Sequence, residues 1–129
     1  MSKLRNLKKR THSAQKNGRS LKARKRLTMK KMYVLVRKDL DAVYRMVQGS
    51  HALAQYLIQY PELGKEWNNS TIVFLGERNE DALSLTALKL TMKKKVFAEF
   101  REPDLKNQLT AIACFDEGNI FKNHNIITL

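Results

Sequence analysis

The chain has a single cysteine, two prolines and five glycines in 129 residues. One cysteine, Cys114, cannot form an intramolecular disulfide, and its place in an apolar run is typical of a buried residue in a reducing compartment. The apolar stretches are interrupted by charge well short of the roughly 20 residues that cross a bilayer. We therefore expect no membrane span, no export signal and a cytoplasmic protein.

Several sequence patterns that carry chemistry are also lacking. The three histidines, His12, His51 and His124, have no Cys or His at the spacing of metal ligands, so we expect no metal site. No glycine-rich phosphate loop follows the first predicted strand, and no Gly-x-Ser-x-Gly motif occurs, which argues against nucleotide hydrolysis and serine-esterase chemistry. Any catalysis would use water, acidic side chains and hydrogen-bond donors, without a cofactor.

Acidic residues are absent from the first 31 residues, which contain 13 Lys and Arg. The remaining residues carry 12 basic and 12 acidic side chains, so the whole formal charge of +13 belongs to this basic arm. Such a segment buries too little apolar surface to fold alone, and its natural counterpart is a polyanion. We predict a disordered nucleic-acid-binding arm over 1–31 and a single domain over 32–129. The candidate phosphate contacts in the arm are Lys22, Arg24, Lys25 and Arg26.

The arm has three alternative interpretations. It could be a solvated tail that only improves solubility, a nuclear import signal at 22–26, or a mitochondrial presequence. No aromatic residue precedes Tyr33, so the arm cannot stack on bases and its affinity for RNA or DNA should be non-specific.

The domain alternates between patterns of strands and helices. Strands are predicted at 32–36, 71–75, 96–100 and 109–115. One helix is indicated by apolar residues from Val43 to Ile58 and should end at Pro61; a second begins after the N-cap Asn79 and ends at Lys93–Lys95. The order predicts an α/β fold, with parallel crossovers first and a neighbouring strand pair last.

Two loops hold the polar residues suited to a site. The segment 101–108 separates the last two strands, and 37–41 follows the first strand. Because sites in such folds gather at strand ends, we expect Arg37 and Lys38 to contact RNA. His51 lies at the edge of the predicted helix face, where we expect a packing and hydrogen-bonding role as well as a substrate contact.

The chain resembles the type II peptidyl-tRNA hydrolase family. The resemblance covers roughly 32–115 and rests on Met-Tyr-Val-Leu-Val-Arg-Lys-Asp-Leu at 32–40, Gln-Gly-Ser-His-Ala at 48–52, Trp67, and Thr-Ala-Ile-Ala-Cys at 110–114. It implies a three-layer α-β-α fold with a mixed four-stranded sheet. It also implies metal-free hydrolysis of the ester between a peptide and the 3′ ribose of tRNA.

The resemblance also suggests which residues would act. Asp104, in the short Glu-Pro-Asp loop, is the candidate to orient a water molecule, with Glu102 as the alternative. Thr110 or Arg45 would donate a hydrogen bond to the carbonyl oxygen. The sequence departs from the family because Val43-Tyr44 replaces its Gly-Lys pair and because its Asp-Ala-Gly-x-Thr loop is shortened.

Two functions follow from these observations, and a third class, a partner-binding module that uses the arm only for localisation, is left open. The chain could be a peptidyl-tRNA hydrolase-like enzyme whose arm binds tRNA or the ribosome. It could instead be a non-catalytic module that binds RNA or a ribonucleoprotein on the same fold. The missing lysine favours the second and the retained helix motif favours the first; a homodimer is left open.

Removing residues 1–31 should abolish most of the affinity for RNA. Each phosphate contact contributes about 0.9 to the slope of log affinity against log salt concentration on a duplex, so the slope should flatten as well. Salt titrations of binding by the full and truncated chains measure this. An unchanged slope would show that the arm does not contact phosphate.

Overall fold

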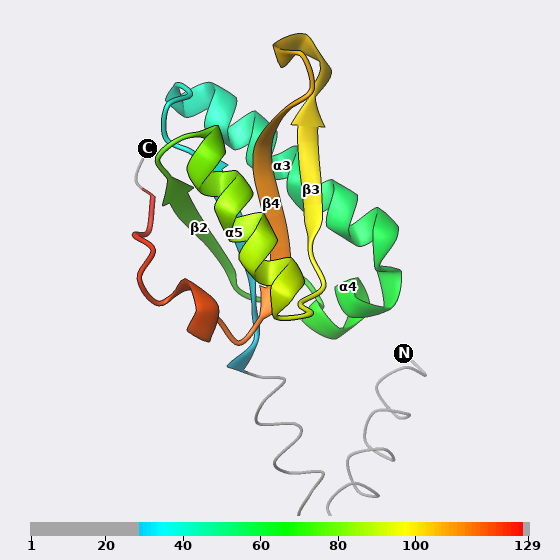
Figure 1. Ribbon diagram of the computed structural model, residues 1–129. Coiled ribbons are helices and arrows are strands. Elements are labelled where there is room, and N and C mark those ends of the chain that lie inside the picture. Colours follow the sequence, from blue (N-terminus) through cyan, green and yellow to red (C-terminus); the bar gives the residue numbers. More distant parts are fainter. Residues whose placement is uncertain (1–28, 128–129) are drawn as a thin grey trace, which may run out of the picture.

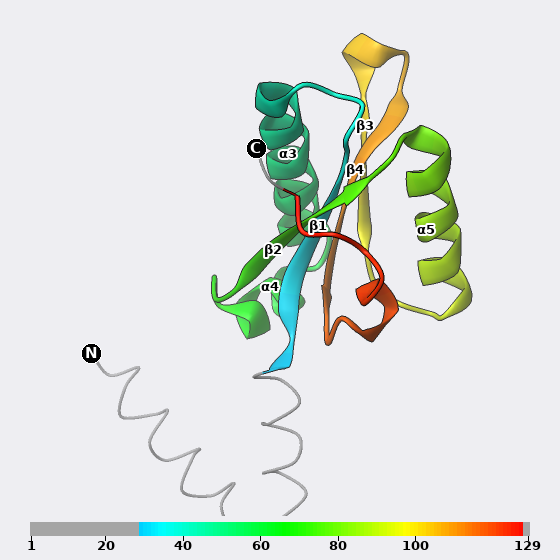
Figure 2. The ribbon, with the colours of Figure 1, turned by 90° about the vertical axis from the view of Figure 1, so that its left-hand side faces the viewer.

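The computed structural model describes residues 29–127, which form a mixed four-stranded sheet between two layers of helices (Figures 1 and 2). The strand order is β2-β1-β4-β3. The strands are β1 (Lys31–Arg37), β2 (Ile72–Glu77), β3 (Ala98–Glu102) and β4 (Gln108–Asp116). β1 pairs in parallel with β2, whereas β4 runs antiparallel to both β1 and β3. The expected α/β class is confirmed.

The two faces of the sheet are covered by different helices. Figure 2 shows α3 (Ala42–Gln59) on one side and α5 (Glu80–Met92) on the other, and α4 (Pro61–Trp67) follows α3 on the first side. A connection through α3 and α4 joins the parallel strands β1 and β2, and α5 leads from β2 to β3 at the opposite edge of the sheet. The predicted three-layer arrangement is therefore observed.

Most of the predicted arm, residues 1–28, lies outside the described residues. Its last residue, Lys31, pairs with Asp116 and opens β1. A truncation that leaves the sheet whole therefore has to retain Lys31.

Alternation along β1 divides the core between the two faces of the sheet. Met32, Val34 and Val36 lie on the α3 side, and Leu35 lies on the α5 side. The α3 side also buries Ala52, Tyr56, Trp67, Ala98, Ala111, Ala113 and Phe115. The α5 side buries Leu75, Leu83, Ala87, Leu90, Leu109, Ile112, Cys114 and Phe121. Both faces of the central strands are thus removed from water, as in sheets sandwiched between helices.

The helix expected before Pro61 is present, but a different face of it is buried. Of the apolar residues that indicated it, Val43 and Ile58 are 65% and 74% exposed. The face against the sheet contains Gln48, Gly49, Ala52 and Tyr56. Small residues occupy this face because the alanines of β3 and β4 beneath it let the helix backbone approach closely.

Pro61 ends α3, as expected, and also begins a helix that the sequence did not indicate. Proline suits the first position of a helix because its missing N–H would have no partner there. The seven-residue α4 ends at Asn68, whose backbone is left-handed with φ 53°. Trp67 is buried, and its indole N–H donates to the carbonyl of Thr71 at 3.0 Å.

The ends of the other elements are set by local hydrogen bonds. Asn79 caps α5 by accepting from the backbone N–H of Ala82 at 3.0 Å, as expected. The helix stops at Met92, so the predicted last turn at Lys93–Lys95 lies just beyond it. β3 begins two residues later than predicted and extends to Glu102, because the hairpin pairing with β4 continues into the expected loop.

Cys114 is fully buried, as its sequence context indicated. Its thiol donates to the carbonyl of Val96 at 3.3 Å, and burial raises the pKa of the thiol to about 12. The side chain therefore stays protonated and acts as a small apolar residue.

The C-terminal segment lies along the outer edge of β2. The N–H of Gly76 donates to the backbone carbonyl of Asn125 at 3.1 Å, and the N–H of Ile127 donates to that of Phe74 at 3.0 Å. His124 Nε2 lies 2.8 Å from the carboxylate of Glu77, which joins the segment to the end of β2. Among the helices of residues 29–127, none is both long and apolar enough to span a membrane.

Gly49→Ala should destabilise the domain although alanine is the better helix former. A Cβ at this position would lie 2.5 Å from the Phe74 ring and 3.1 Å from Val36, so the sheet or α3 would have to move. Overpacking of this kind costs about 1–3 kcal/mol, which exceeds the gain of about 1 kcal/mol in helix propensity. Urea unfolding measures the change, and the exposed neighbour substitution Ser50→Ala is the control. A Gly49→Ala variant as stable as wild type would contradict the packing.

Candidate functional site

The turn between β3 and β4 packs against the first half of α3. A short 3-10 helix (Pro103–Leu105) follows β3, and Asp104 lies in it with its side chain exposed. Lys106 and Asn107 then take left-handed backbone conformations with φ 55° and 61°. The N–H of Asn107 donates to the backbone carbonyl of Glu102 at 2.9 Å. The turn is therefore a hydrogen-bonded structure that presents its two carboxylates beside α3.

Gln48 connects this turn to the helix and to β4. Its Nε2 donates to Glu102 Oε1 at 2.8 Å, and its Oε1 accepts from the hydroxyl of Thr110 at 2.6 Å. Gln48 and Thr110 are fully buried, and Thr110 Oγ1 also lies 3.3 Å from the carbonyl of Phe100. A buried amide that lost either partner would cost about 1–3 kcal/mol, so this chain of bonds holds Glu102 in place.

Glu102 is held ionised by its neighbours. The hydrogen bond from Gln48 lowers the pKa of its carboxyl, and the N–H of Asp104 and the nearby His51 act in the same direction. The N–H of Asp104 donates to Glu102 Oε2 at 3.2 Å. Both oxygens of Glu102 therefore accept hydrogen bonds, and the carboxylate positions the turn.

Tyr44 and His51 lie on either side of Gln48 on the same face of α3. The pKa of the Tyr44 phenol is raised by partial desolvation and by the charges of Glu102 and Asp104, so the phenol keeps its proton near these carboxylates. The ring of His51 stacks on Phe100 with centroids 4.4 Å apart and an angle of 11° between the planes. A phenol, an imidazole and two carboxylates thus gather where α3 meets the β3–β4 turn.

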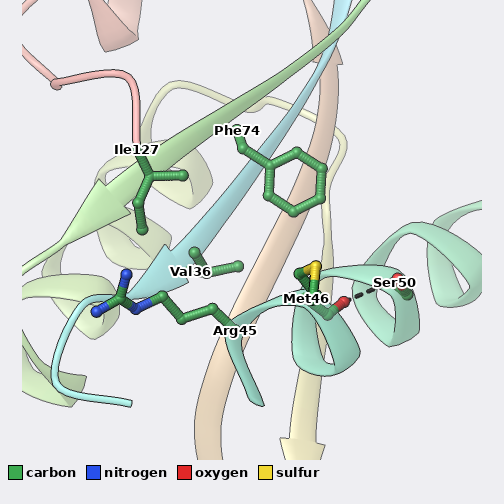
Figure 3. A pocket seen from close by; sticks show the side chains of 6 residues that line it. All are labelled: Val36, Arg45, Met46, Ser50, Phe74 and Ile127. Atoms are coloured by element: carbon green, nitrogen blue, oxygen red, sulfur yellow. Dashed lines mark hydrogen bonds between the residues drawn. The ribbon is translucent and has the colours of Figure 1, made fainter. Parts of the chain in front are cut away.

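Arg45 points away from this cluster. Its Nε donates to the carbonyl of Leu40 at 2.7 Å, and its Nη2 donates to that of Lys38 at 3.1 Å, so the guanidinium fastens the loop after β1. Figure 3 shows it at the rim of a cavity of about 410 Å³. The cavity is lined by Val36, Arg45, Met46, Ser50, Phe74 and Ile127.

Arg37 is a buried structural residue. Its Nε and Nη2 donate to the two carboxylate oxygens of Asp39, at 3.0 and 2.7 Å. Its Nη1 lies 2.9 Å from Gln108 Oε1 and 3.3 Å from the carbonyl of Leu109. The guanidinium therefore joins the exit of β1 to the start of β4, whereas Lys38 beside it is exposed.

The structure brings some of the candidate residues together and separates others. Asp104, Thr110 and His51 belong to the cluster between α3 and the β3–β4 turn, although the hydroxyl of Thr110 is directed to Gln48. Arg45 and Arg37 serve the loop after β1. Lys22, Arg24, Lys25 and Arg26 lie outside the described residues.

Sequence reasoning did not assign roles to Gln48 and Tyr44. Their spacing holds a usable signal, because positions 44, 48 and 51 share one side of a helix. Within residues 29–127, no three His, Cys, Asp or Glu side chains come close enough together to hold a metal ion.

Comparison with known proteins gives a relation of fold. No family model matches the chain, and the search of curated proteins finds no match. A solved structure from Agrobacterium tumefaciens, of a protein of unknown function, superposes with a TM-score of 0.58 and 14% sequence identity. The match covers 77% of this chain and 98% of that chain. At this identity the likeness concerns the fold alone.

Asp39→Asn should make the free energy of unfolding less sensitive to pH in the acidic range. The hydrogen bond from Arg37 lowers the pKa of Asp39. The stabilisation of the fold by the ionised carboxylate is therefore complete above the ordinary pKa of about 3.9, and it is lost as the pH falls through the lowered pKa. At pH 7 the substitution should cost about 1 kcal/mol, since the carboxylate is partly exposed. Urea unfolding at pH 7 and pH 3 measures both effects, with the exposed Asp81→Asn as control. Equal losses on acidification in Asp39→Asn and wild type would contradict this role.

Proposed function

We propose that the protein hydrolyses the ester that joins a peptide to the 3′ end of tRNA, at the cluster between α3 and the β3–β4 turn. The observation that carries the proposal is that Gln48 holds Glu102, whose carboxylate also accepts from the N–H of Asp104, against the same helix that carries Tyr44. The resemblance to type II peptidyl-tRNA hydrolases in the same segments supports the choice of substrate.

In this proposal the exposed Asp104 orients a water molecule and takes its proton. The water oxygen forms a bond to the acyl carbon while the bond between that carbon and the ribose oxygen breaks. That proton then passes from Asp104 to the departing ribose oxygen, which becomes the hydroxyl of the tRNA. The peptide leaves as an acid that releases the second proton of the water to solvent and becomes a carboxylate. A carboxylate in this role is typical of general base catalysis and contributes about 10²–10⁴-fold.

Tyr44 is the donor for the charge that develops on the carbonyl oxygen. A phenol is protonated at neutral pH, as a donor must be, and partial desolvation and the nearby carboxylates raise its pKa further. Thr110 acts as a positioning residue, since its hydroxyl donates to Gln48. Arg45 supports the neighbouring loop through Lys38 and Leu40.

A non-catalytic RNA-binding module is the second candidate. It is favoured by the burial of Thr110 and by the backbone hydrogen bonds of Arg45, because neither donor is free to meet a substrate as the sequence suggested. In both cases the 13 basic residues of the first 31 supply contacts to phosphate.

Cleavage of peptidyl-tRNA by the full chain, assayed with a metal chelator present, tests the proposal. Asp104→Asn should lower the rate by about 100-fold or more while leaving tRNA binding unchanged. Tyr44→Phe should lower it by about 10²-fold, the usual effect of one lost oxyanion donor. Asp81→Asn, an exposed carboxylate on α5, is the matched control.

The outcomes separate the two functions. Cleavage that survives Asp104→Asn would remove the assigned base. Binding of tRNA without cleavage by the wild-type chain would establish the second candidate in place of the first.

A further inference from the structure

The folded domain has its own cluster of basic residues, at the end of the sheet opposite the candidate site. β1 begins there and α5 ends there, as Figure 1 shows. The cluster, called here the basic end, consists of Lys30, Lys31, Lys93, Lys94 and Lys95. Four of these side chains belong to exposed residues, and Lys30 is partly exposed.

Contacts with the end of β4 bring the two halves of the basic end together. Lys31 pairs with Asp116 across the sheet, and Lys95 Nζ lies 2.9 Å from Asp116 Oδ1. The ammonium of Lys30 lies 5.6 Å from the centroid of Phe115. Lys30 and Lys31 therefore lie at the same end of the sheet as the lysines that follow α5.

The end of α5 keeps its lysines exposed. Lys94 has a left-handed backbone with φ 57°, and the N–H of Lys95 donates to the carbonyl of Leu90 at 2.9 Å. The C-terminal charge of the helix dipole accounts for one favourable cation. The neighbouring acids are Asp116, which is paired with Lys95, the exposed Glu117, and Glu99, which lies 3.7 Å from Arg101. Five lysines exceed what the dipole and these acids balance.

A polar hollow of about 490 Å³ adjoins the basic end at the outer edge of β3. It is lined by Gln59, Tyr60, Thr91, Lys95, Phe97 and Glu99. The rings of Tyr60 and Phe97 are turned toward the core, since Tyr60 packs against Tyr56 and Phe97 packs against the buried residues on the α5 side. The hollow therefore presents hydrogen-bonding side chains and one lysine, with a single carboxylate. Groups of this kind contact the phosphate and sugar of a nucleic acid.

We propose that the basic end and the adjoining polar hollow bind the phosphate backbone of single-stranded RNA. The inference rests on the proposed RNA partner and adds a binding surface formed by described residues of the domain. β1 separates this surface from the candidate site, and its seven residues span about 20 Å. The protein then holds RNA at one end of the sheet and the reacting 3′ end at the other.

Binding of a fluorescent oligouridylate by the full chain tests the surface. In Lys93→Gln/Lys94→Gly, glycine suits the left-handed position while two charges are lost. Single-stranded contacts contribute about 0.7 each to the salt slope, so the slope should fall by about 1.4 and affinity in 0.1 M salt by roughly 20-fold. Lys65→Gln/Arg78→Gln is the control, since both side chains are exposed and belong neither to the basic end nor to the candidate site. Its salt slope should equal that of wild type.

The hollow is tested by a substitution that keeps charge constant. Gln59→Ala should weaken binding by about 5-fold without changing the salt slope, because one hydrogen bond is worth about 1 kcal/mol. Circular dichroism melting shows whether the variant has kept its fold.

Three results would overturn the inference. The first is that the two double variants lose RNA affinity equally. The second is that Lys93→Gln/Lys94→Gly binds RNA as tightly as wild type. The third is that this variant binds anionic phospholipid vesicles more weakly while its affinity for RNA is unchanged. Failure of the hydrolase proposal would appear separately, as tRNA binding without ester cleavage.

Discussion

The position of α3 on the sheet depends on the side-chain amide of Gln48. It donates to Glu102 at the end of β3 and accepts from Thr110 in β4, while the surrounding helix face is small and apolar. Sliding or rotating the helix would leave buried polar atoms without partners, at a cost of about 1–3 kcal/mol for each group. The placement of Tyr44 and His51 beside the carboxylates follows from this one bridge.

The elements of the fold were largely predictable, because β-forming runs and capping residues act locally. Asn79 and Pro61 marked helix ends as expected. The seven residues of α4 are too few to show a period, which is why the second role of Pro61 was missed. The buried face of α3 was also wrong, because close packing on alanines selected Gly49 and Ala52 over larger apolar residues such as Val43.

The site was predictable in part. The Glu-Pro-Asp turn and the Gln-Gly-Ser-His-Ala helix were identified from their residues, and the fold places them side by side. The direction of the Thr110 side chain could not be predicted from the sequence. β4 from Leu109 to Asp116 is buried on both faces, so its apolar and polar residues do not alternate. The burial of Arg37 depends on partners about 70 residues away, Gln108 and Leu109, which no local pattern reveals.

The segment along β2 has a consequence for how copies of the chain meet. β2 is an edge strand, and an uncovered edge offers unpaired N–H and C=O groups to any passing strand. Here Asn125 and Ile127 use the groups of Gly76 and Phe74, so that edge is already occupied. The opposite edge is β3, which is short and carries Glu99, Arg101 and Glu102. Each edge thus has its own obstacle to sheet extension, one a covering segment and the other charge, which guards the fold against growing into open-ended strand-paired aggregates.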